Sequence, residues 1–336
     1  MLSKILVIQF SSIRNIVLSS PVLRCIKKQL PEAELHFLTS QSFLKHNLEN
    51  PYVNRFFYLD NDLQSMTDTL ANEAYDYVID LDKSLRSFKI KKKLQTKSYT
   101  LRKLTVEKFL LTRFNINIMP GIHYTQRCIN TVAALAVKDD GLGLDYFIPA
   151  KDIVSESDLP HSHLFGFIVL AIGASKFTKK LPVHKLKELC RKIEYPIILL
   201  GGSEAAMEGE QIAAVDNIKV YNACGKFNLN ETADIIRQSK LVIAPDTALQ
   251  YISCAFKKPL LALWGATTPA LDVGPYYGKI FMDLQQEPVY ENIYFNPGCQ
   301  PCSFDGTRQC PMVHFDCMEK LDIDRIVKKA NKWLGK

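Results

Sequence analysis

One stretch, Leu241–Pro269, carries the strongest structural signal in the chain and reads LVIAPDTALQYISCAFKKPLLALWGATTP. It begins with an apolar run, Leu241–Ala244, that has the length of a buried strand and ends at Pro245. Apolar residues then recur at helical spacing from Leu249 to Phe256, and a second apolar run covers Leu260–Trp264. Strand, turn, helix and strand in this order build a parallel sheet, so the stretch predicts an α/β fold.

The turn at Asp246 and Thr247 is a candidate anion site. It follows a predicted strand and precedes a predicted helix, where free backbone N–H groups and the helix dipole favour a phosphate. Thr247 is expected to cap that helix with its hydroxyl group. An ordinary capping turn explains the same residues equally well, because helix N-termini greatly outnumber phosphate sites.

Length and composition indicate a two-domain globular protein. A chain of 336 residues suits two domains of roughly 150 residues each. Its apolar runs are shorter than the ~20 residues that span a bilayer, and the N-terminus lacks a signal-peptide pattern, so we expect a cytoplasmic protein. We expect the scattered cysteines to be reduced core residues; these are Cys25, Cys128, Cys190, Cys224 and Cys254.

Strands and helices are predicted to alternate through both halves of the chain. In the first half we expect a strand at Lys4–Phe10, a loop at Ser11–Asn15 and a helix at Ile16–Gln29. The second half repeats the pattern, with Pro182 in the first turn of a helix at Val183–Ile193. The polar, proline-broken segment Ser155–His163 is the predicted linker, which gives domains 1–155 and 156–336.

The stretch Leu241–Pro269 resembles the signature of the bacterial lipopolysaccharide heptosyltransferase family, glycosyltransferase family 9. That signature has Asp-Thr-Gly, two or three variable residues with a histidine, a helix, and an apolar strand that ends near Gly-x-Thr-x-Pro. The matching residues are Asp246, Thr247, Trp264, Gly265, Thr267 and Pro269. Two positions depart from it, because Ala248 replaces the glycine and Tyr251 replaces the histidine.

Two segments of the first half resemble the same family. The family's N-terminal loop reads Ser-Ser-(apolar)-Gly-Asp, and here Arg14 and Asn15 replace the glycine and the aspartate. A later segment reads Asp-Leu-His-x-x-x-Arg-Ser in the family, and here Asp82 replaces the histidine. The residues that match in this segment are Asp80, Leu81, Arg86 and Ser87.

The resemblance implies a GT-B architecture, in which two Rossmann-like doubly wound domains face one another across a cleft. It also implies inverting, metal-independent transfer of heptose from ADP-heptose to a lipopolysaccharide core, without a cofactor. The predicted donor-binding residues are Ser175, Lys179, Glu204, Asp246, Thr247, Ala248, Leu249 and Gln250. A surface lysine and a carboxylate at a helix start explain Lys179 and Glu204 equally well.

The candidate catalytic base is a problem for this interpretation. The resemblance places the base at position 15, where an asparagine cannot accept a proton at neutral pH. Asp82 is the nearest alternative by its place after a strand. Three interpretations follow: an active transferase with another base, a slow transferase that relies on donor activation and positioning, or a degenerate member that binds nucleotide sugar or glycolipid without turnover. The predicted acceptor-binding residues are Ser12, Arg14, Arg86 and Lys89.

The segment Lys83–Arg113 is strongly basic, and Glu107 is its one acidic residue. A solvated face is the usual explanation of such a run. An anionic glycolipid acceptor or the cytoplasmic face of the inner membrane would also fit it. Nucleic acid is not expected, because no nucleic-acid motif appears. NAD is not expected either, because no Gly-x-Gly-x-x-Gly follows a predicted strand.

A cysteine-rich tail closes the sequence. Cys299, Cys302, Cys310 and Cys317, with His314 among them, have spacings compatible with zinc. Only one Cys-x2-Cys pair is present, and reduced thiols are typical of the cytosol, so we predict free cysteines and no metal.

Overall fold

The structure is a computed structural model that describes residues 3–335. Its backbone contacts divide the chain into two compact units. The first unit comprises Met1–Lys103, Ile122–Phe147 and Gly278–Met282. The second unit comprises Leu104–Gly121, Ile148–Tyr277 and Asp283–Lys336. The segment Ser155–His163, predicted as a linker, therefore lies within the second unit.

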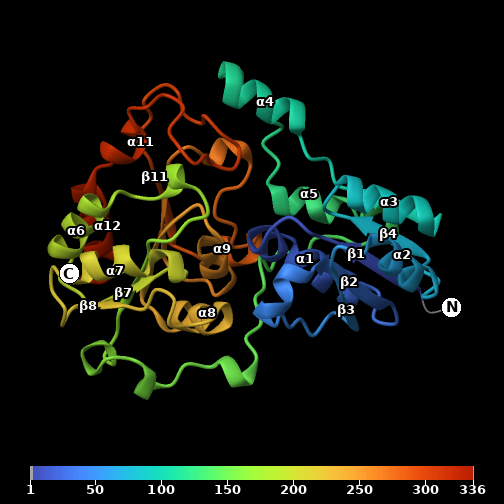
Figure 1. Ribbon diagram of the computed structural model, residues 1–336, viewed down its shortest axis with the longest axis horizontal. Coiled ribbons are helices and arrows are strands. Elements are labelled where there is room, and N and C mark those ends of the chain that lie inside the picture. Colours follow the sequence, from blue (N-terminus) through green and yellow to red (C-terminus); the bar gives the residue numbers. More distant parts are fainter. Residues whose placement is uncertain (1–2, 336) are drawn as a thin grey trace. The chain divides into compact units, whose positions relative to one another are not determined.

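The first unit contains a parallel five-stranded sheet in the order β3-β2-β1-β4-β5 (Figure 1). The strand order reverses between β1 and β4, so the connections that follow these two strands run in opposite directions. Open α/β sheets bind ligands at the carboxyl ends of the strands at such a reversal. The strands are β1 (Lys4–Ile8), β2 (Glu34–Ser40), β3 (Arg55–Leu59), β4 (Tyr77–Asp80) and β5 (Lys97–Thr100). The helices are α1 (Ile13–Gln29), α2 (Leu63–Ala71), α3 (Leu85–Leu94) and α5 (Tyr124–Asn130).

Helix α1 starts earlier than the sequence predicts. Ser12 is its N-cap, and the Ser12 hydroxyl accepts a hydrogen bond from the Asn15 N–H at 3.2 Å. The predicted loop Ser11–Asn15 was therefore wrong at its second half, because Arg14 and Asn15 lie in the first helical turn. The expected strand Lys4–Phe10 also ends two residues sooner, at Ile8.

A buried arginine fixes α1 within the first unit. Arg24 is 2% exposed, donates two hydrogen bonds to Asp140 at 2.8 Å, and also pairs with Asp145. Burial lowers the pKa of the Arg24 guanidinium, but Asp140 and Asp145 more than offset this, so the pKa lies above its ordinary value. The charge is therefore retained and satisfied, as a buried arginine requires.

The second unit contains a parallel six-stranded sheet in the order β11-β10-β9-β6-β7-β8. Its reversal lies between β6 and β9, which pair through Leu170 and Ile243. The strands are β6 (Ile168–Ala171), β7 (Ile197–Leu200), β8 (Val220–Asn222), β9 (Leu241–Pro245), β10 (Leu260–Leu263) and β11 (Tyr290–Ile293). The helices are α4 (Thr105–Phe114), α6 (Val183–Lys192), α7 (Ala206–Ala213), α8 (Leu229–Gln238), α9 (Ala248–Ala255), α11 (Asp316–Glu319) and α12 (Ile323–Trp333), and α10 (Lys279–Asp283) spans the boundary of the units.

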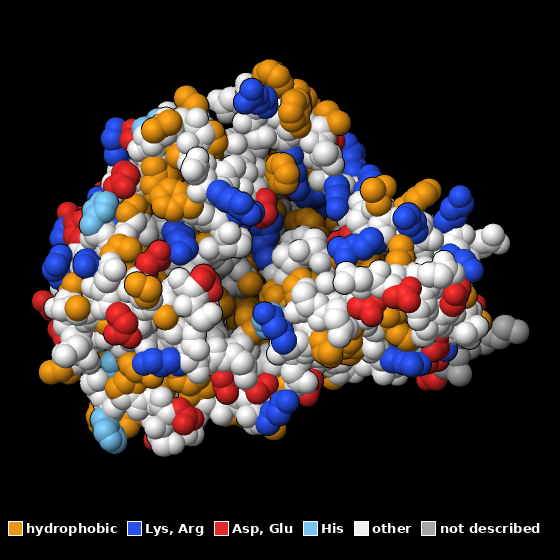
Figure 2. All heavy atoms as spheres, viewed as in Figure 1, with side chains coloured by type: hydrophobic (Ala, Val, Ile, Leu, Met, Phe, Trp, Pro, Cys, Tyr) orange, Lys and Arg blue, Asp and Glu red, His pale blue; other side chains and the backbone are white. Residues whose placement is uncertain are grey.

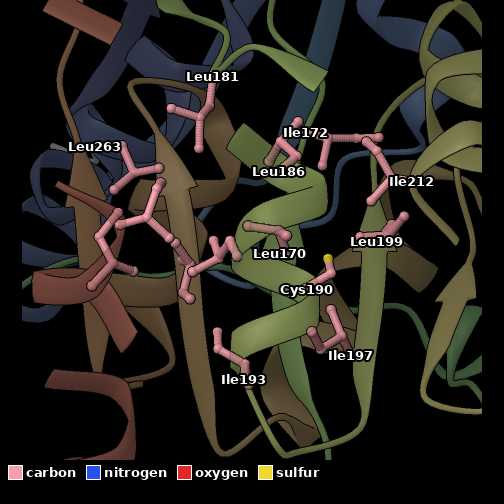
Figure 3. Packing of buried hydrophobic residues seen from close by; sticks show 14 of the residues in the cluster. Leu170, Ile172, Leu181, Leu186, Cys190, Ile193, Ile197, Leu199, Ile212 and Leu263 are labelled. Atoms are coloured by element: carbon pink, nitrogen blue, oxygen red, sulfur yellow. The ribbon is translucent and has the colours of Figure 1, made fainter. Parts of the chain in front are cut away.

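The core of the second unit forms where α6 covers the sheet (Figure 3). Leu186 and Cys190 of α6 lie against Leu170 of β6 and Leu199 of β7, and all four are at most 1% exposed. Pro182 is the N-cap of α6 rather than a residue of its first turn, which corrects the prediction by one position. The five scattered cysteines are all buried, as predicted. Among residues 3–335, no helix is long and apolar enough to cross a membrane.

Candidate functional site

The candidate donor site lies in the second unit, at the carboxyl ends of β6 and β9. The loop after β6 carries Ser175 and Lys179, and the turn after β9 carries Asp246 and Thr247. These two strands are neighbours at the sheet's reversal point, so their exits lie side by side. The fold therefore brings together the two loops that the sequence singled out.

Asp246 is the centre of a buried polar network. It is 2% exposed, and its Oδ2 lies 3.0 Å from Nζ of Lys179, itself 3% exposed. The Thr267 hydroxyl donates to the same oxygen at 3.0 Å, and the Tyr251 hydroxyl lies 3.1 Å from Oδ1. Burying a charge is costly unless it is paired and hydrogen-bonded, and this network meets both conditions. Asp246 therefore positions Lys179 and is not itself a free ligand.

This network explains the residue at position 251. Tyr251 is fully buried, and its hydroxyl also lies 2.6 Å from the carbonyl oxygen of Val273. A tyrosine can thus supply a hydrogen bond toward Asp246, where the family signature has a histidine. Gly265 of the signature has a steric explanation, because a Cβ there would lie 2.3 Å from the carbonyl oxygen of Thr178.

The amino end of α9 holds buried polar atoms without partners. Thr247 is the N-cap in extended conformation, but its hydroxyl makes no capping bond, which corrects that prediction. The Thr247 hydroxyl and both amide atoms of Gln250 are buried and lack a hydrogen-bond partner. Gln250 is 0% exposed, and a buried side-chain amide in a native protein normally has a hydrogen-bond partner. Ala248 and Leu249 complete this first turn, whose backbone N–H groups have no partner within the helix.

Ser175 and Glu204 lie near this network but are not part of it. Both side chains are exposed. Glu204 follows β7, the neighbour of β6 in the sheet. Its Oε1 lies 3.7 Å from the position that a Cβ would take if Gly173 carried a side chain. Both residues are therefore at the same sheet edge as Lys179.

The cysteine-rich tail covers Lys179, a contact the sequence did not indicate. Asp305 Oδ1 lies 3.3 Å from the Lys179 ammonium, and Thr307 N–H donates to the Thr178 hydroxyl at 2.7 Å. Gly306 has φ +81°, and a Cβ there would lie 2.9 Å from the Cβ of Lys176 and 3.1 Å from the Lys179 side chain. Glycine is thus required twice, by the left-handed conformation and by the close approach. The dipeptide Asp305-Gly306 indicates a turn in the sequence but not the contact of that turn with Lys179.

One tail cysteine is linked to the same region, because the Cys302 N–H donates to the Ala266 carbonyl oxygen at 3.1 Å and the Ala266 N–H donates to the Thr178 carbonyl oxygen at 3.0 Å. Cys317 is buried, the other three are half-buried, and Sγ of Cys299 is 3.8 Å from Nε2 of His314. Burial, reinforced by neighbouring thiols, raises the pKa of Cys302 to about 11 and that of Cys317 to about 12. The prediction of free thiols without a metal stays a prediction.

Among the described residues, two other groups of side chains have the composition of a metal site. Cys25 lies with Asp139 and Asp140, and Glu34 lies with His36 and Glu73. Each group has a resident cation, since Arg24 pairs with Asp140 and Lys4 lies 2.7 Å from Glu73. Both are therefore explained as ion-pair clusters.

In the first unit, Asn15 belongs to a hydrogen-bonded chain of side chains. Its Nδ2 donates to the Ser11 hydroxyl at 2.7 Å, which donates to Gln9 Oε1 at 3.0 Å. Gln9 Nε2 in turn donates to the Tyr124 hydroxyl at 3.0 Å. Burial raises the pKa of Tyr124 well above its ordinary value, so the phenol stays neutral. Asn15 Oδ1 is buried and lacks a partner. The sequence did not single out Gln9 or Tyr124.

Asp82 lies at the same sheet edge. It is 3% exposed, and its Oδ1 accepts a hydrogen bond from the Phe10 N–H at 3.1 Å, which ties the exits of β1 and β4 together. Its neighbour Asp80 pairs with Lys91 at 2.7 Å, so part of the basic segment is neutralised. Arg86 is exposed and stacks over the Phe10 ring, 4.9 Å from its centroid, and Lys89 is exposed.

Comparison with known proteins gives consistent matches over most of the chain. It is 24% identical over 295 residues to lipopolysaccharide heptosyltransferase 1 of Campylobacter coli, covering 79% of this chain and 84% of that one. The structure of E. coli ADP-heptose lps heptosyltransferase II aligns with TM-score 0.72 and 18% identity over 98% of both chains. The structure of E. coli heptosyltransferase WaaC with ADP aligns with TM-score 0.66 and 17% identity, over 98% and 99% of the chains. These alignments confirm the predicted α/β, GT-B fold class.

The family model of glycosyltransferase family 9 (heptosyltransferase) matches residues 63–288, more than half of the chain and including the stretch Leu241–Pro269. The matched range includes Asp246 and the two positions, 248 and 251, that depart from the signature. The chain belongs to glycosyltransferase family 9.

Proposed function

We propose that this enzyme transfers heptose, or a related sugar, from an ADP-heptose type of donor to an anionic lipopolysaccharide core acceptor. Family membership supports a glycosyl transfer, and the names of the relatives supply the donor and acceptor classes. The E. coli relative solved with ADP supports an adenine nucleotide as the donor's leaving group. The finer assignment depends on the sites of this chain itself.

The observation that carries the proposal is the unpartnered polar set at the amino end of α9. The Thr247 hydroxyl and the Gln250 amide are buried without partners, next to the buried Lys179. Oxygen atoms of a nucleoside diphosphate would accept hydrogen bonds from these groups, and the helix dipole favours the negative charge. We assign Ser175 and Glu204, at neighbouring strand ends, to the more exposed part of the donor.

The chemistry requires two different contributions from the protein. An acceptor hydroxyl attacks the anomeric carbon while the bond from that carbon to the diphosphate oxygen breaks and ADP leaves. The positive charge of Lys179 and the N–H groups of α9 would stabilise the negative charge that develops on the diphosphate. The acceptor hydroxyl must also lose its proton to a base.

The catalytic base is the part of the site at which this chain departs from the family. Asn15, in the family's candidate base position, carries an amide that cannot accept the proton. Asp82 is a carboxylate at the same sheet edge, and one of its oxygens is engaged by the Phe10 N–H. We propose Asp82 as the base of an active enzyme, with Ser12, Arg14, Arg86 and Lys89 on the acceptor side.

A second candidate function is binding of the nucleotide sugar or glycolipid without turnover. The presence of Asn15 instead of a carboxylate favours this alternative, because it removes the base and leaves the donor-site residues in place. Release of ADP from ADP-heptose in the presence of a lipid A core acceptor distinguishes the two functions. Turnover that Asp82→Asn slows supports the active enzyme, and donor binding without ADP release supports the second function.

Removing the charge of Lys179 should weaken ADP binding. We expect Lys179→Gln to lower the affinity roughly 10–100-fold, since a charge-assisted hydrogen bond contributes ~1.5–3 kcal/mol. Glutamine can still donate to Asp246, which limits damage to the buried network. Isothermal titration calorimetry with ADP measures the effect. Lys180→Gln is the matched control, because the neighbouring Lys180 pairs with Glu208 at 3.1 Å instead. Equal affinities of both variants and the wild type would remove Lys179 from the site.

Neutralising Asp305 should have the opposite effect. Its carboxylate lies 3.3 Å from the Lys179 ammonium and is half exposed, so it competes with a phosphate for the same cation. We expect Asp305→Asn to tighten ADP binding several-fold, because exposed ion pairs contribute at most about 1 kcal/mol. The same calorimetric titration reports it. Weaker binding by Asp305→Asn would show that this carboxylate assists the donor and does not compete with it.

A further inference from the structure

The segment Leu104–Gly121 of the second unit exposes an unusual number of large apolar side chains. We call five of them the α4 surface: Val106 (65% exposed), Phe109 (55%), Phe114 (59%), Ile116 (50%) and Ile118 (52%). Three belong to helix α4 and two to the segment directly after it. Single exposed apolar residues are normal, but a continuous run of them marks an interaction site.

The residues of the α4 surface are not the ones through which helix α4 packs against the rest of the protein. Helix α4 already buries its inward side, since Leu111 is 4% exposed and Leu104, at its N-cap, is 3% exposed. The exposed residues are on other positions of the helix. The rings of Phe109 and Phe114 pack edge to face with centroids 5.8 Å apart, so they form one aromatic patch. The helix thus has a second apolar side that the described chain leaves uncovered.

Positive charges surround this patch. Lys108 and Arg113 lie within the segment, Arg102 and Lys103 directly precede it, and Glu107 is its one acidic residue. Figure 2 shows Lys and Arg side chains interspersed with hydrophobic ones around the position that α4 has in Figure 1. A helix with aromatic residues beside lysine and arginine is typical of peptides that lie in the membrane interface.

We propose that the α4 surface docks this enzyme on an anionic phospholipid bilayer. Phe109 and Phe114 would enter the boundary between headgroups and acyl chains, while Arg113 and its basic neighbours contact the phosphates. The ten-residue helix is too short to span a bilayer, so it lies along the surface. Charge complementarity selects this partner, because a cationic rim attracts an anionic leaflet and an aromatic patch gains from burial there. The docking goes beyond the proposed function and requires no turnover.

The test uses the full chain and vesicles of phosphatidylcholine containing 30% phosphatidylglycerol, with pure phosphatidylcholine vesicles for comparison. We expect the wild type to float with the anionic vesicles and Phe109→Ser/Phe114→Ser to bind them at least ~10-fold more weakly. Phe165→Ser/Ile218→Ser is the matched control, because these apolar residues are 96% and 74% exposed elsewhere in the second unit. The control variant should bind like the wild type. Calorimetric ADP binding, measured without vesicles, shows that each variant is folded.

Two further measurements separate insertion from simple charge attraction. Arg113→Glu should weaken binding at low salt and have little effect at ~0.5 M salt, where electrostatic attraction is screened. A Phe109→Trp variant should show a blue-shifted emission with anionic vesicles, since the indole leaves water. Absence of vesicle binding, unchanged binding of the double serine variant, or no emission shift would overturn the proposal. A double serine variant that instead converts a dimer to a monomer would identify the α4 surface as a protein interface and would also overturn it.

Discussion

Replacing Asn15 with aspartate should raise the rate of sugar transfer by about 10²–10⁴-fold, the usual contribution of a general base, if Asp82 does not already serve as the base. Position 15 lies in the first turn of α1, where the Ser11 hydroxyl is at hydrogen-bond distance and the helix dipole favours a carboxylate. Asparagine and aspartate are nearly isosteric, so we expect little change in stability. Release of ADP from ADP-heptose with a lipid A core acceptor is the measurement.

The neighbouring Arg14 makes a double variant the stronger test. A guanidinium beside the new carboxylate would lower its pKa and weaken it as a base. Arg14→Gly with Asn15→Asp restores the family's loop sequence and should exceed the single variant in rate. A double variant that binds ADP but releases none from ADP-heptose would rule out Asn15 as the missing group. A fast wild type that Asp82→Asn slows would show that Asp82 is the base and that position 15 is not needed.

Removing the Asp246 carboxylate should destabilise the second unit by ~3–5 kcal/mol, because Asp246→Ala leaves the buried Lys179 charge without its buried partner. The same substitution removes the acceptor of the Thr267 hydroxyl and one acceptor of Tyr251. Urea denaturation followed by tryptophan fluorescence measures this, since both tryptophans, Trp264 and Trp333, belong to the second unit. The signal therefore reports the unit in question.

Thr267→Val is the matched control for Asp246→Ala. It deletes one hydrogen bond to the same carboxylate but leaves the Lys179 pair in place, so it should cost less than Asp246→Ala, about 1.5–3 kcal/mol. Equal losses of unfolding free energy in the two variants would contradict the account of Asp246 as the partner of a buried charge.

Much of the fold could be predicted because the apolar runs of a parallel sheet are distinctive. Leu241–Ala244 and Leu260–Trp264 were expected as strands, and the structure has strands at Leu241–Pro245 and Leu260–Leu263. Strand exits in such a sheet meet at one edge, so the neighbourhood of Lys179 and Asp246 could also be expected. Both inferences use only local periodicity and the handedness of the crossover.

The remaining features depend on contacts between residues far apart in the sequence. Nothing local indicates that Asp305 and Gly306, more than 120 residues after Lys179, cover its ammonium group. The start of α1 was misplaced because Ser12 caps the helix four residues before Ile16, where the apolar spacing becomes regular. Thr247 was expected to use its hydroxyl as a cap, but the structure leaves that group unpartnered beside Gln250.

The most direct test of the donor site is calorimetric titration of the wild-type chain with ADP and, separately, with NAD. The site at β6, β9 and α9 predicts that ADP binds with a defined heat and that Lys179→Gln weakens this binding. It predicts no comparable heat for NAD, whose phosphate loop the sequence lacks. Absence of ADP binding, or equal binding of NAD that is insensitive to Lys179→Gln, would contradict the assignment of this site to a nucleotide-sugar donor.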